Sequence, residues 1–331
     1  MFLAMLCYIP HMRYRQLGRT GYEVSEVGYG AWGIGGQLWV GANDSVSVRA
    51  LHRAIDQGLN FIDTALSYGN GHSEKLVGAV LRDRSERICV ATKVPPKNRI
   101  WPATGKVSEV FPSSHLSKCV DKSLVNLGLD RIDLIQLHVW DPSWLEEEYW
   151  YEELIRLKQQ GKINYWGVCV TDHQPDSAID LVLSGKVDTL QVIYNIFDQS
   201  PASGLFQVCA DKKVGVIVRV PFDEGALTGN VGLTTKFPKR DWRNFYFRGD
   251  RKAQVQERVQ KLLEFLDKET KSLPELSLKF CLSHPAVSTV IPGMRSVQHV
   301  EDNLAVSGQP PLPKAIVRKL YSCRWEKNFY R

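Results

Sequence analysis

Residues 45–63 read SVSVRALHRAIDQGLNFID, and this stretch contains one complete unit of the predicted fold. Apolar residues recur every three or four positions over Ser45–Gln57, which is the spacing of a helix with one buried face. Gly58 follows at a position where glycine commonly ends a helix, and Asn60–Asp63 is a short apolar strand that ends in a carboxylate. A helix that leads through a glycine into a buried strand is the repeating unit of an α/β protein.

The same alternation of strands and helices extends outward along the chain in both directions. Segments of helical spacing separate eight short apolar runs, and no change of composition marks a domain boundary. The eight predicted strands are Val27–Ala31, Asn60–Asp63, Ile88–Lys93, Ile132–His138, Ile163–Cys169, Thr189–Val192, Val214–Val218 and Val287–Ile291. Eight such units indicate a single parallel (β/α)8 barrel, the TIM barrel.

A β-hairpin is predicted ahead of the first strand, because two alternating stretches flank the glycine-bracketed turn Gly18–Gly21. We place the barrel at residues 13–331 and treat residues 1–12 as an N-terminal extension. A doubly wound dinucleotide fold is the alternative, but it requires a GxGxxG turn after the first strand. Trp32 interrupts the glycines at that point, so the barrel is favoured.

One connection is too long for a simple turn between a strand and a helix. It covers about residues 222–250, after the seventh strand, and we expect it to form a lid. Basic and aromatic residues alternate in it, a pattern that also occurs in proteins that bind single-stranded nucleic acid. A lid over an enzyme site is the interpretation we favour.

The composition of the 331-residue chain limits the classes of function. Charged residues make up 24% with both signs mixed, which excludes global disorder. The net charge of +6 is too small to indicate nucleic acid, and no apolar run is long enough to span a membrane. Seven cysteines without a CxxC pair indicate reduced thiols in the cytoplasm. We therefore expect neither a nucleic-acid nor a membrane partner, and no metal site.

Polar side chains follow three neighbouring predicted strands, at the ends where a barrel of this kind carries its chemistry. Asp63 ends the second strand and Tyr68 follows it after one turn, while Lys93 ends the third strand and His138 the fourth. Each of them has a structural alternative, such as a helix cap, a solvated lysine or a packed core histidine. All four at consecutive strand ends predict an active site.

These four residues are suited to protonating an oxygen. A phenol has a pKa near 10, too high for efficient proton donation at neutral pH. We expect the Lys93 ammonium to lower the pKa of Tyr68, and Asp63 to pair with Lys93 and hold it in place. His138 could donate a hydrogen bond to a carbonyl. The set supplies no hydride, so a reduction by these residues would require a cofactor.

The sequence resembles the aldo-keto reductase family over about residues 13–305. The motifs that carry the resemblance are Gly58–Ala65, Tyr68-Gly69, Ser73-Glu74, Ala91–Lys93, Leu137-His138, Gly161–Ile163, Gln191, Tyr194-Asn195 and Ile291–Gly293, and the loop Arg219–Gly225 is similar to a bacterial and plant-type branch. The family implies a (β/α)8 barrel that binds NADPH across its strand ends. It also implies the catalytic tetrad Asp63, Tyr68, Lys93 and His138, with Tyr68 as general acid.

The resemblance further implies a set of cofactor contacts. Relatives hold the nicotinamide with a serine and an asparagine after the fifth strand and a glutamine on the sixth; Gln191 matches, whereas Cys169 and Thr171 replace the other two. The remaining implied contacts are Trp32, Arg219, Phe222, Gly225, Leu227, Gly229, Gly293, Arg295, Ser296, His299 and Asn303. Arg295 and Ser296 offer a cation and a hydroxyl to a 2′-phosphate, so we expect NADPH/NADP, with NADH bound more weakly.

We expect NADPH-dependent reduction of a small aldehyde or ketone, with Trp32, Trp39, Trp140 and Phe222 as an aromatic substrate pocket. The alternative is a redox-sensing regulatory subunit that holds the cofactor and turns it over slowly. Turnover and cofactor release distinguish the two. The physiological substrate and the oligomeric state stay open, because specificity in this fold depends on loop geometry.

Overall fold

A computed structural model describes residues 12–326 of the chain. The predicted hairpin is present: β1 (Tyr14–Gln16) and β2 (Glu23–Ser25) pair antiparallel, and Gly21 adopts a left-handed φ of 74° after the turn. Of the predicted N-terminal extension, residues 1–11 lie outside the described part. Met12 is buried.

Eight parallel strands follow, each hydrogen-bonded to the next in chain order. They are β3 (Tyr29–Gly30), β4 (Phe61–Asp63), β5 (Cys89–Val94), β6 (Ile132–Leu137), β7 (Ile163–Cys169), β8 (Thr189–Ile193), β9 (Gly215–Arg219) and β10 (Val287–Val290). Parallel bridges from Val27 to Val290 and from Gly30 to Gly293 join the two ends of the sheet. The predicted (β/α)8 barrel is thereby confirmed.

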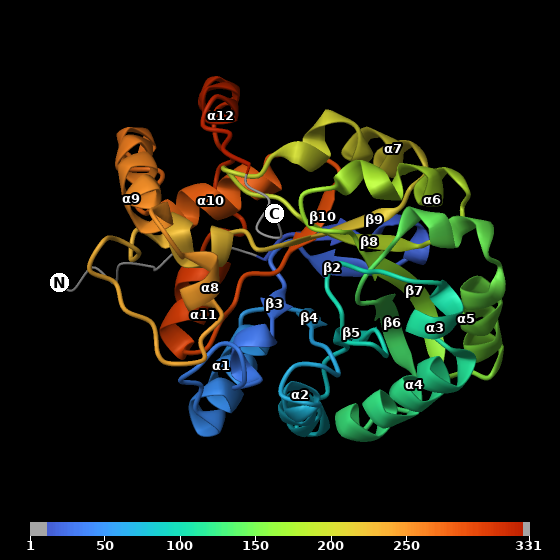
Figure 1. The fold of residues 1–331 in the computed structure, drawn as a ribbon. Coiled ribbons are helices and arrows are strands. Elements are labelled where there is room, and N and C mark those ends of the chain that lie inside the picture. Colours follow the sequence, from blue (N-terminus) through green and yellow to red (C-terminus); the bar gives the residue numbers. More distant parts are fainter. Residues whose placement is uncertain (1–11, 327–331) are drawn as a thin grey trace.

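Helices surround the strands (Figure 1). The helices that follow strands are α1 (Asp44–Asp56), α2 (His72–Arg82), α4 (Ser113–Leu127), α5 (Tyr149–Gln159), α6 (Ile179–Leu183), α7 (Leu205–Asp211), α10 (Leu273–Leu282) and α11 (Val297–Leu304), and four others are α3 (Val107–Val110), α8 (Arg243–Tyr246), α9 (Arg251–Leu262) and α12 (Lys314–Tyr321). Helix α1 begins where the Asn43 side chain accepts a hydrogen bond from the Val46 amide. It ends before Gly58, whose φ of 89° suits glycine. No helix within residues 12–326 combines the length and apolar character needed to cross a membrane.

The barrel interior changes from apolar to polar along its axis. Leu17 and Val24 of the hairpin share a buried cluster with strand residues Phe61, Cys89, Ala91, Leu134 and Ile217, so the hairpin closes the amino end of the barrel. Side chains two positions further along a strand point to the same side. Asp63, Lys93 and Gln136 are such positions, and the polar groups therefore gather at the carboxyl ends.

The lid after β9 crosses this end of the barrel. It begins with a short turn of 3-10 helix, Asp223–Thr228, and continues to α8. Its far part docks on the loop after β3: the Trp242 amide donates to Leu38 O at 2.8 Å, and the Arg243 guanidinium lies 4.3 Å from the centre of the Trp39 ring. The long loop predicted at residues 222–250 thus bridges two sides of the barrel mouth.

Candidate active site

A cavity of about 1080 Å³ opens at the carboxyl ends of the strands. Asp63, Tyr68 and His138 line it, and Lys93 lies fully buried beneath them. The four residues predicted from neighbouring strand ends therefore come together. Their roles in catalysis stay a prediction that the geometry below supports.

Lys93 lies at the centre of the hydrogen bonds in this group. Its Nζ donates to Asp63 Oδ2 at 2.6 Å, to the backbone oxygen of Thr64 at 2.8 Å and to Tyr68 Oη at 3.2 Å. An ammonium has three protons to donate, and each has a partner here. Burial by itself lowers the pKa of Lys93, but the charge of Asp63 outweighs it and carries that pKa above its ordinary value. Lys93 is therefore a cation whose position is fixed on all sides.

The expected lowering of the pKa of Tyr68 is wrong for this structure. Burial raises the pKa of Tyr68 to about 12, and the Lys93 ammonium opposes that rise without cancelling it. The cause is that a phenolate in the barrel interior loses its hydration. Tyr68 is thus a neutral phenol, with its proton available and a cation 3.2 Å away to stabilise the phenolate left after donation.

His138 is a neutral imidazole. Burial, with the nearby charges of Lys93 and Arg219, holds its pKa well below the usual range. The Ser67 hydroxyl lies 3.3 Å from His138 Nδ1, and the Tyr68 and His138 rings meet edge to face at 5.8 Å. A neutral imidazole still carries one N–H that can donate to a carbonyl oxygen. The sequence alone does not single out Ser67, which precedes Tyr68 in a loop.

Two amides hold the second oxygen of Asp63. Gln191 Nε2 donates to Asp63 Oδ1 at 2.7 Å, and Gln136 Nε2 donates to the same oxygen at 3.2 Å. The sequence predicts Gln191 as a nicotinamide contact, and it lines the cavity. Gln136 was not among the predicted site residues. Its signal is positional, since it lies two residues before His138 on an inward-facing register of β6.

Most of the predicted cofactor contacts line the cavity. They are Trp32, Cys169, Thr171, Gln191, Arg219, Phe222, Gly225, Gly293, Arg295, His299 and Asn303. Leu227, Gly229 and Ser296 are not among the lining residues. Leu227 is fully buried in the core, and the Ser296 hydroxyl caps α11 by accepting from the His299 amide at 3.2 Å. Thr171 donates to Trp140 O at 2.7 Å, so its hydroxyl is already engaged.

The aromatic wall differs from the predicted one at a single residue. Trp32, Trp39 and Phe222 line the cavity, but Trp140 does not. Its ring packs against Trp144 and Trp150 in the core, and its Nε1 donates to Ser177 O at 3.2 Å. Trp101, from the loop after β5, lies at the mouth instead, with its ring centre 5.9 Å from that of His138.

One end of the cavity is rich in guanidinium groups. Arg243 of the lid and Arg295 both line it, and burial together with the charge of Arg243 lowers the pKa of Arg295. Arg243 also donates to both oxygens of the buried Asp241 at 2.8 Å, so one carboxylate faces two guanidinium groups. The excess of positive charge favours an anionic ligand. The added methyl of an alanine at Gly293 would meet open space, so this end also has room for a ligand. These residues fit a phosphate-bearing dinucleotide.

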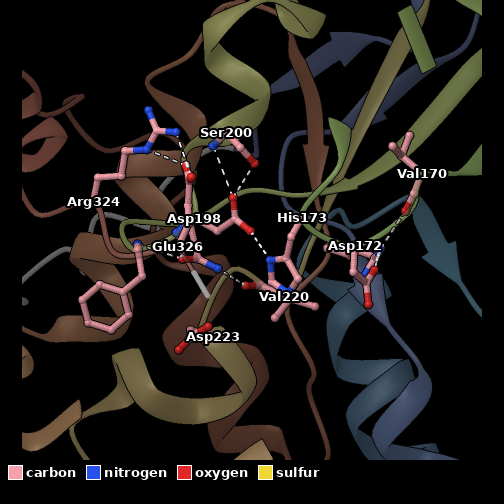
Figure 2. Close-up of polar contacts among 12 residues, drawn as sticks. Val170, Asp172, His173, Asp198, Ser200, Val220, Asp223, Arg324 and Glu326 are labelled. Atoms are coloured by element: carbon pink, nitrogen blue, oxygen red, sulfur yellow. Dashed lines mark hydrogen bonds and ion pairs between the residues drawn. The ribbon is translucent and has the colours of Figure 1, made fainter. Parts of the chain in front are cut away.

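Acidic residues line the cavity as well. Arg219 pairs with Asp172 and donates to Val170 O at 3.1 Å. His173, the residue after Asp172, turns away and contacts Asp198 Oδ2 through its Nδ1 at 2.8 Å (Figure 2). Glu224 also lines the cavity, and burial raises its pKa to about 8. It is therefore mostly protonated at neutral pH and adds little negative charge. Within residues 12–326, no three His, Cys, Asp or Glu side chains are grouped to hold a metal ion.

Comparisons with known proteins agree with this geometry. The Aldo/keto reductase family model matches residues 26–324. The chain is 28% identical to "Aldo-keto reductase YhdN" of Bacillus subtilis (strain 168), over 90% of this chain and 89% of that one. It is also 28% identical to "Probable voltage-gated potassium channel subunit beta" of Oryza sativa subsp. japonica, over 93% and 95% of the two chains. The solved structure of aldo-keto reductase AKR11C1 from Bacillus halodurans, in its holo form, superposes with a TM-score of 0.75 at 26% identity and covers 97% of this chain and 100% of its own.

Proposed function

Because the chain belongs to the aldo/keto reductase family, we propose that it reduces small aldehydes or ketones to alcohols with NADPH as hydride donor. One observation carries the proposal: the buried Lys93 ammonium joins Asp63 to the Tyr68 hydroxyl at the wall of the cavity. A neutral phenol beside a fixed cation is a proton donor whose conjugate base is stabilised as it forms. The six described cysteines are free thiols, which suits the cytoplasm.

NADPH, when bound, supplies the hydride that reaches the carbonyl carbon. The protein supplies the proton: the carbonyl oxygen accepts it from Tyr68 Oη, and the O–H bond of the phenol breaks. Lys93 stabilises the phenolate that remains, and the neutral His138 imidazole orients the carbonyl through its N–H. Arg243 and Arg295 would hold the phosphate at the adenosine end, and Gln191 and Cys169 would flank the nicotinamide. The product is the alcohol, and Tyr68 regains its proton from water.

The pH dependence of reduction follows from the two pKa shifts. Tyr68, with a pKa of about 12, keeps its proton throughout the ordinary range, and His138 is already neutral at pH 7. We therefore expect kcat for reduction to be flat between about pH 7 and pH 10, because neither group titrates there. The measurement is made at saturating NADPH, since Glu224 titrates near pH 8 beside the cofactor end. A fall of kcat with a midpoint near the ordinary tyrosine value of about 10, above the range in which Glu224 titrates, would contradict the proton-donor state assigned to Tyr68.

The preference for NADPH is expected to depend on Arg295. Arg295→Ala removes a charge-assisted contact to a 2′-phosphate, so NADPH binding should weaken by about 10- to 100-fold. NADH has no such phosphate, and its affinity should change by less than about threefold. Titration of both cofactors by fluorescence measures the difference. Arg318→Ala on the exposed face of α12 is the matched control and should leave both affinities unaltered. Equal losses for the two cofactors would exclude Arg295 as the phosphate contact.

The second candidate is a cofactor-holding regulatory subunit with slow turnover. It is favoured by the similarity to the Oryza sativa protein named as a probable potassium channel subunit. The docking of the lid across the mouth, through the Trp242–Leu38 and Arg243–Trp39 contacts, would also slow cofactor release. This candidate predicts tight NADPH binding with turnover no faster than release.

The deciding experiment is the rate of NADPH oxidation with a reactive aromatic aldehyde, with NADH as a parallel cofactor. Stopped-flow mixing separates hydride transfer from cofactor release. Multiple turnovers with rapid release support the reductase. Cofactor binding without turnover on any carbonyl tested would favour the regulatory subunit, and absence of binding to either cofactor would overturn both.

A further inference from the structure

We propose that Gln136 is a positioning residue for the reduction: it holds the Asp63 carboxylate so that Lys93 stays directed at the Tyr68 hydroxyl. This inference rests on the proposed function and names a residue that acts through others. It is carried by the hydrogen bonds among Asp63, Lys93 and Gln136 at the floor of the cavity.

Strand register brings Gln136 to this position. Lys93 on β5 and Gln136 on β6 are paired neighbours in the sheet, so both side chains enter the barrel at the same level. Gln136 is fully buried, with no exposed surface. An uncharged polar side chain inside a barrel loses its hydration and is stable there only if its amide has partners. Asp63 is the partner of its Nε2, and its Oε1 lies 3.5 Å from Gln191 Nε2.

Asp63 needs more than its cation. A buried carboxylate is costly unless both oxygens accept hydrogen bonds. Lys93 satisfies Oδ2, at 2.6 Å, and leaves Oδ1 to the two amides, Gln136 at 3.2 Å and Gln191 at 2.7 Å. Donors from three different strands therefore fix the plane of one carboxylate. Without them the carboxylate could rotate about its Cβ–Cγ bond and draw Lys93 with it.

The position of Lys93 decides the environment of Tyr68. Two of its three protons go to Asp63 and Thr64 O, and the third goes to Tyr68 Oη at 3.2 Å, the longest of the three contacts. The longest contact is the one most easily lost if the carboxylate moves. Gln136 thus influences the proton donor through Asp63 and Lys93, without touching substrate or cofactor.

Gln136→Glu tests this with a pH signature. The new carboxyl lies beside Asp63, and two buried carboxyls share a proton at low pH. While protonated, Glu can donate to Asp63 as the amide does. As pH rises, that proton leaves, and the added charge repels Asp63 and competes for Lys93. We expect kcat of Gln136→Glu to be within about threefold of wild type near pH 6 and to fall at least about tenfold relative to wild type by pH 9.

Two further variants separate positioning from stability. Gln136→Leu keeps the volume without charge or donor, and its kcat should be lowered about tenfold at all pH values with the KM for NADPH unchanged. Gln199→Glu buries a carboxyl far from the cavity, where the Gln199 amide donates to Ile196 O and Leu320 O; it should lose stability without gaining a pH-dependent kcat. All are measured beside wild type as aldehyde reduction at saturating NADPH.

The outcomes are distinct. A pH-dependent loss in Gln136→Glu that is absent from Gln199→Glu supports the inference, and so does a pH-independent loss in Gln136→Leu should the glutamate variant not fold. If the wild type is active and the Gln136 variants have the same pH profile of kcat, the inference is overturned and the proposed function stands. A wild type that binds NADPH but reduces no carbonyl overturns the proposed function and this inference with it.

Discussion

Replacing Tyr68 by phenylalanine is expected to lower kcat for carbonyl reduction by about 10²- to 10⁴-fold, the usual contribution of a positioned general acid. The phenol is the proton donor that lies both on the cavity wall and in contact with a fixed cation. Phenylalanine keeps the ring that packs near Trp32 and His138. NADPH affinity should therefore stay within about twofold of wild type, and the loss should appear in kcat.

The measurement is single-turnover hydride transfer to an aromatic aldehyde by protein preloaded with NADPH. Tyr151→Phe on α5, outside the barrel, is the matched control and should react as fast as wild type. If Tyr68→Phe transferred hydride at the wild-type rate, the proton would have to come from another group. His138, with its neutral N–H, would then be the next donor to test.

The fold could be predicted closely because each βα unit carries its own local signals. The eight predicted strands are the eight strands of the barrel, and their ends differ by at most two residues. The period of two along a strand also anticipates which residues face inward. Asp63, Lys93 and His138 could be found for this reason, because the carboxyl ends of the parallel strands together form the end of the barrel where the cavity lies.

The features that could not be predicted depend on how side chains and loops pack in three dimensions. Trp140 follows β6, yet whether it turns to the cavity or to the core is decided by Trp144 and Trp150. Trp101 belongs to a loop whose path has no periodic signal. The pKa of Tyr68 depends on how completely the interior excludes water, so the charge of Lys93 alone suggested a shift in the wrong direction. Gln136 has only a positional signal in the sequence, and its role emerges when the hydrogen-bond partners of Asp63 are identified.

Lys93→Met is expected to affect both stability and activity. The substitution leaves the buried Asp63 carboxylate without a cation, and breaking a buried pair in this way costs about 3–5 kcal/mol in the free energy of unfolding. Kinetically, the Tyr68 phenolate loses its stabilising charge, and kcat should fall by at least about 100-fold. Urea unfolding at neutral pH measures the first effect, and aldehyde reduction measures the second.

A second substitution separates the two effects. Asp63→Asn in the Lys93→Met background removes the buried charge, so most of the lost stability should return. The activity should not return, since the cation beside Tyr68 is still missing. If the double variant regained activity together with stability, Lys93 would serve the fold and not the proton donor. If stability stayed low while kcat recovered, the Asp63–Lys93 pair would not be the source of the cost, and the packing of methionine under the cavity would be responsible.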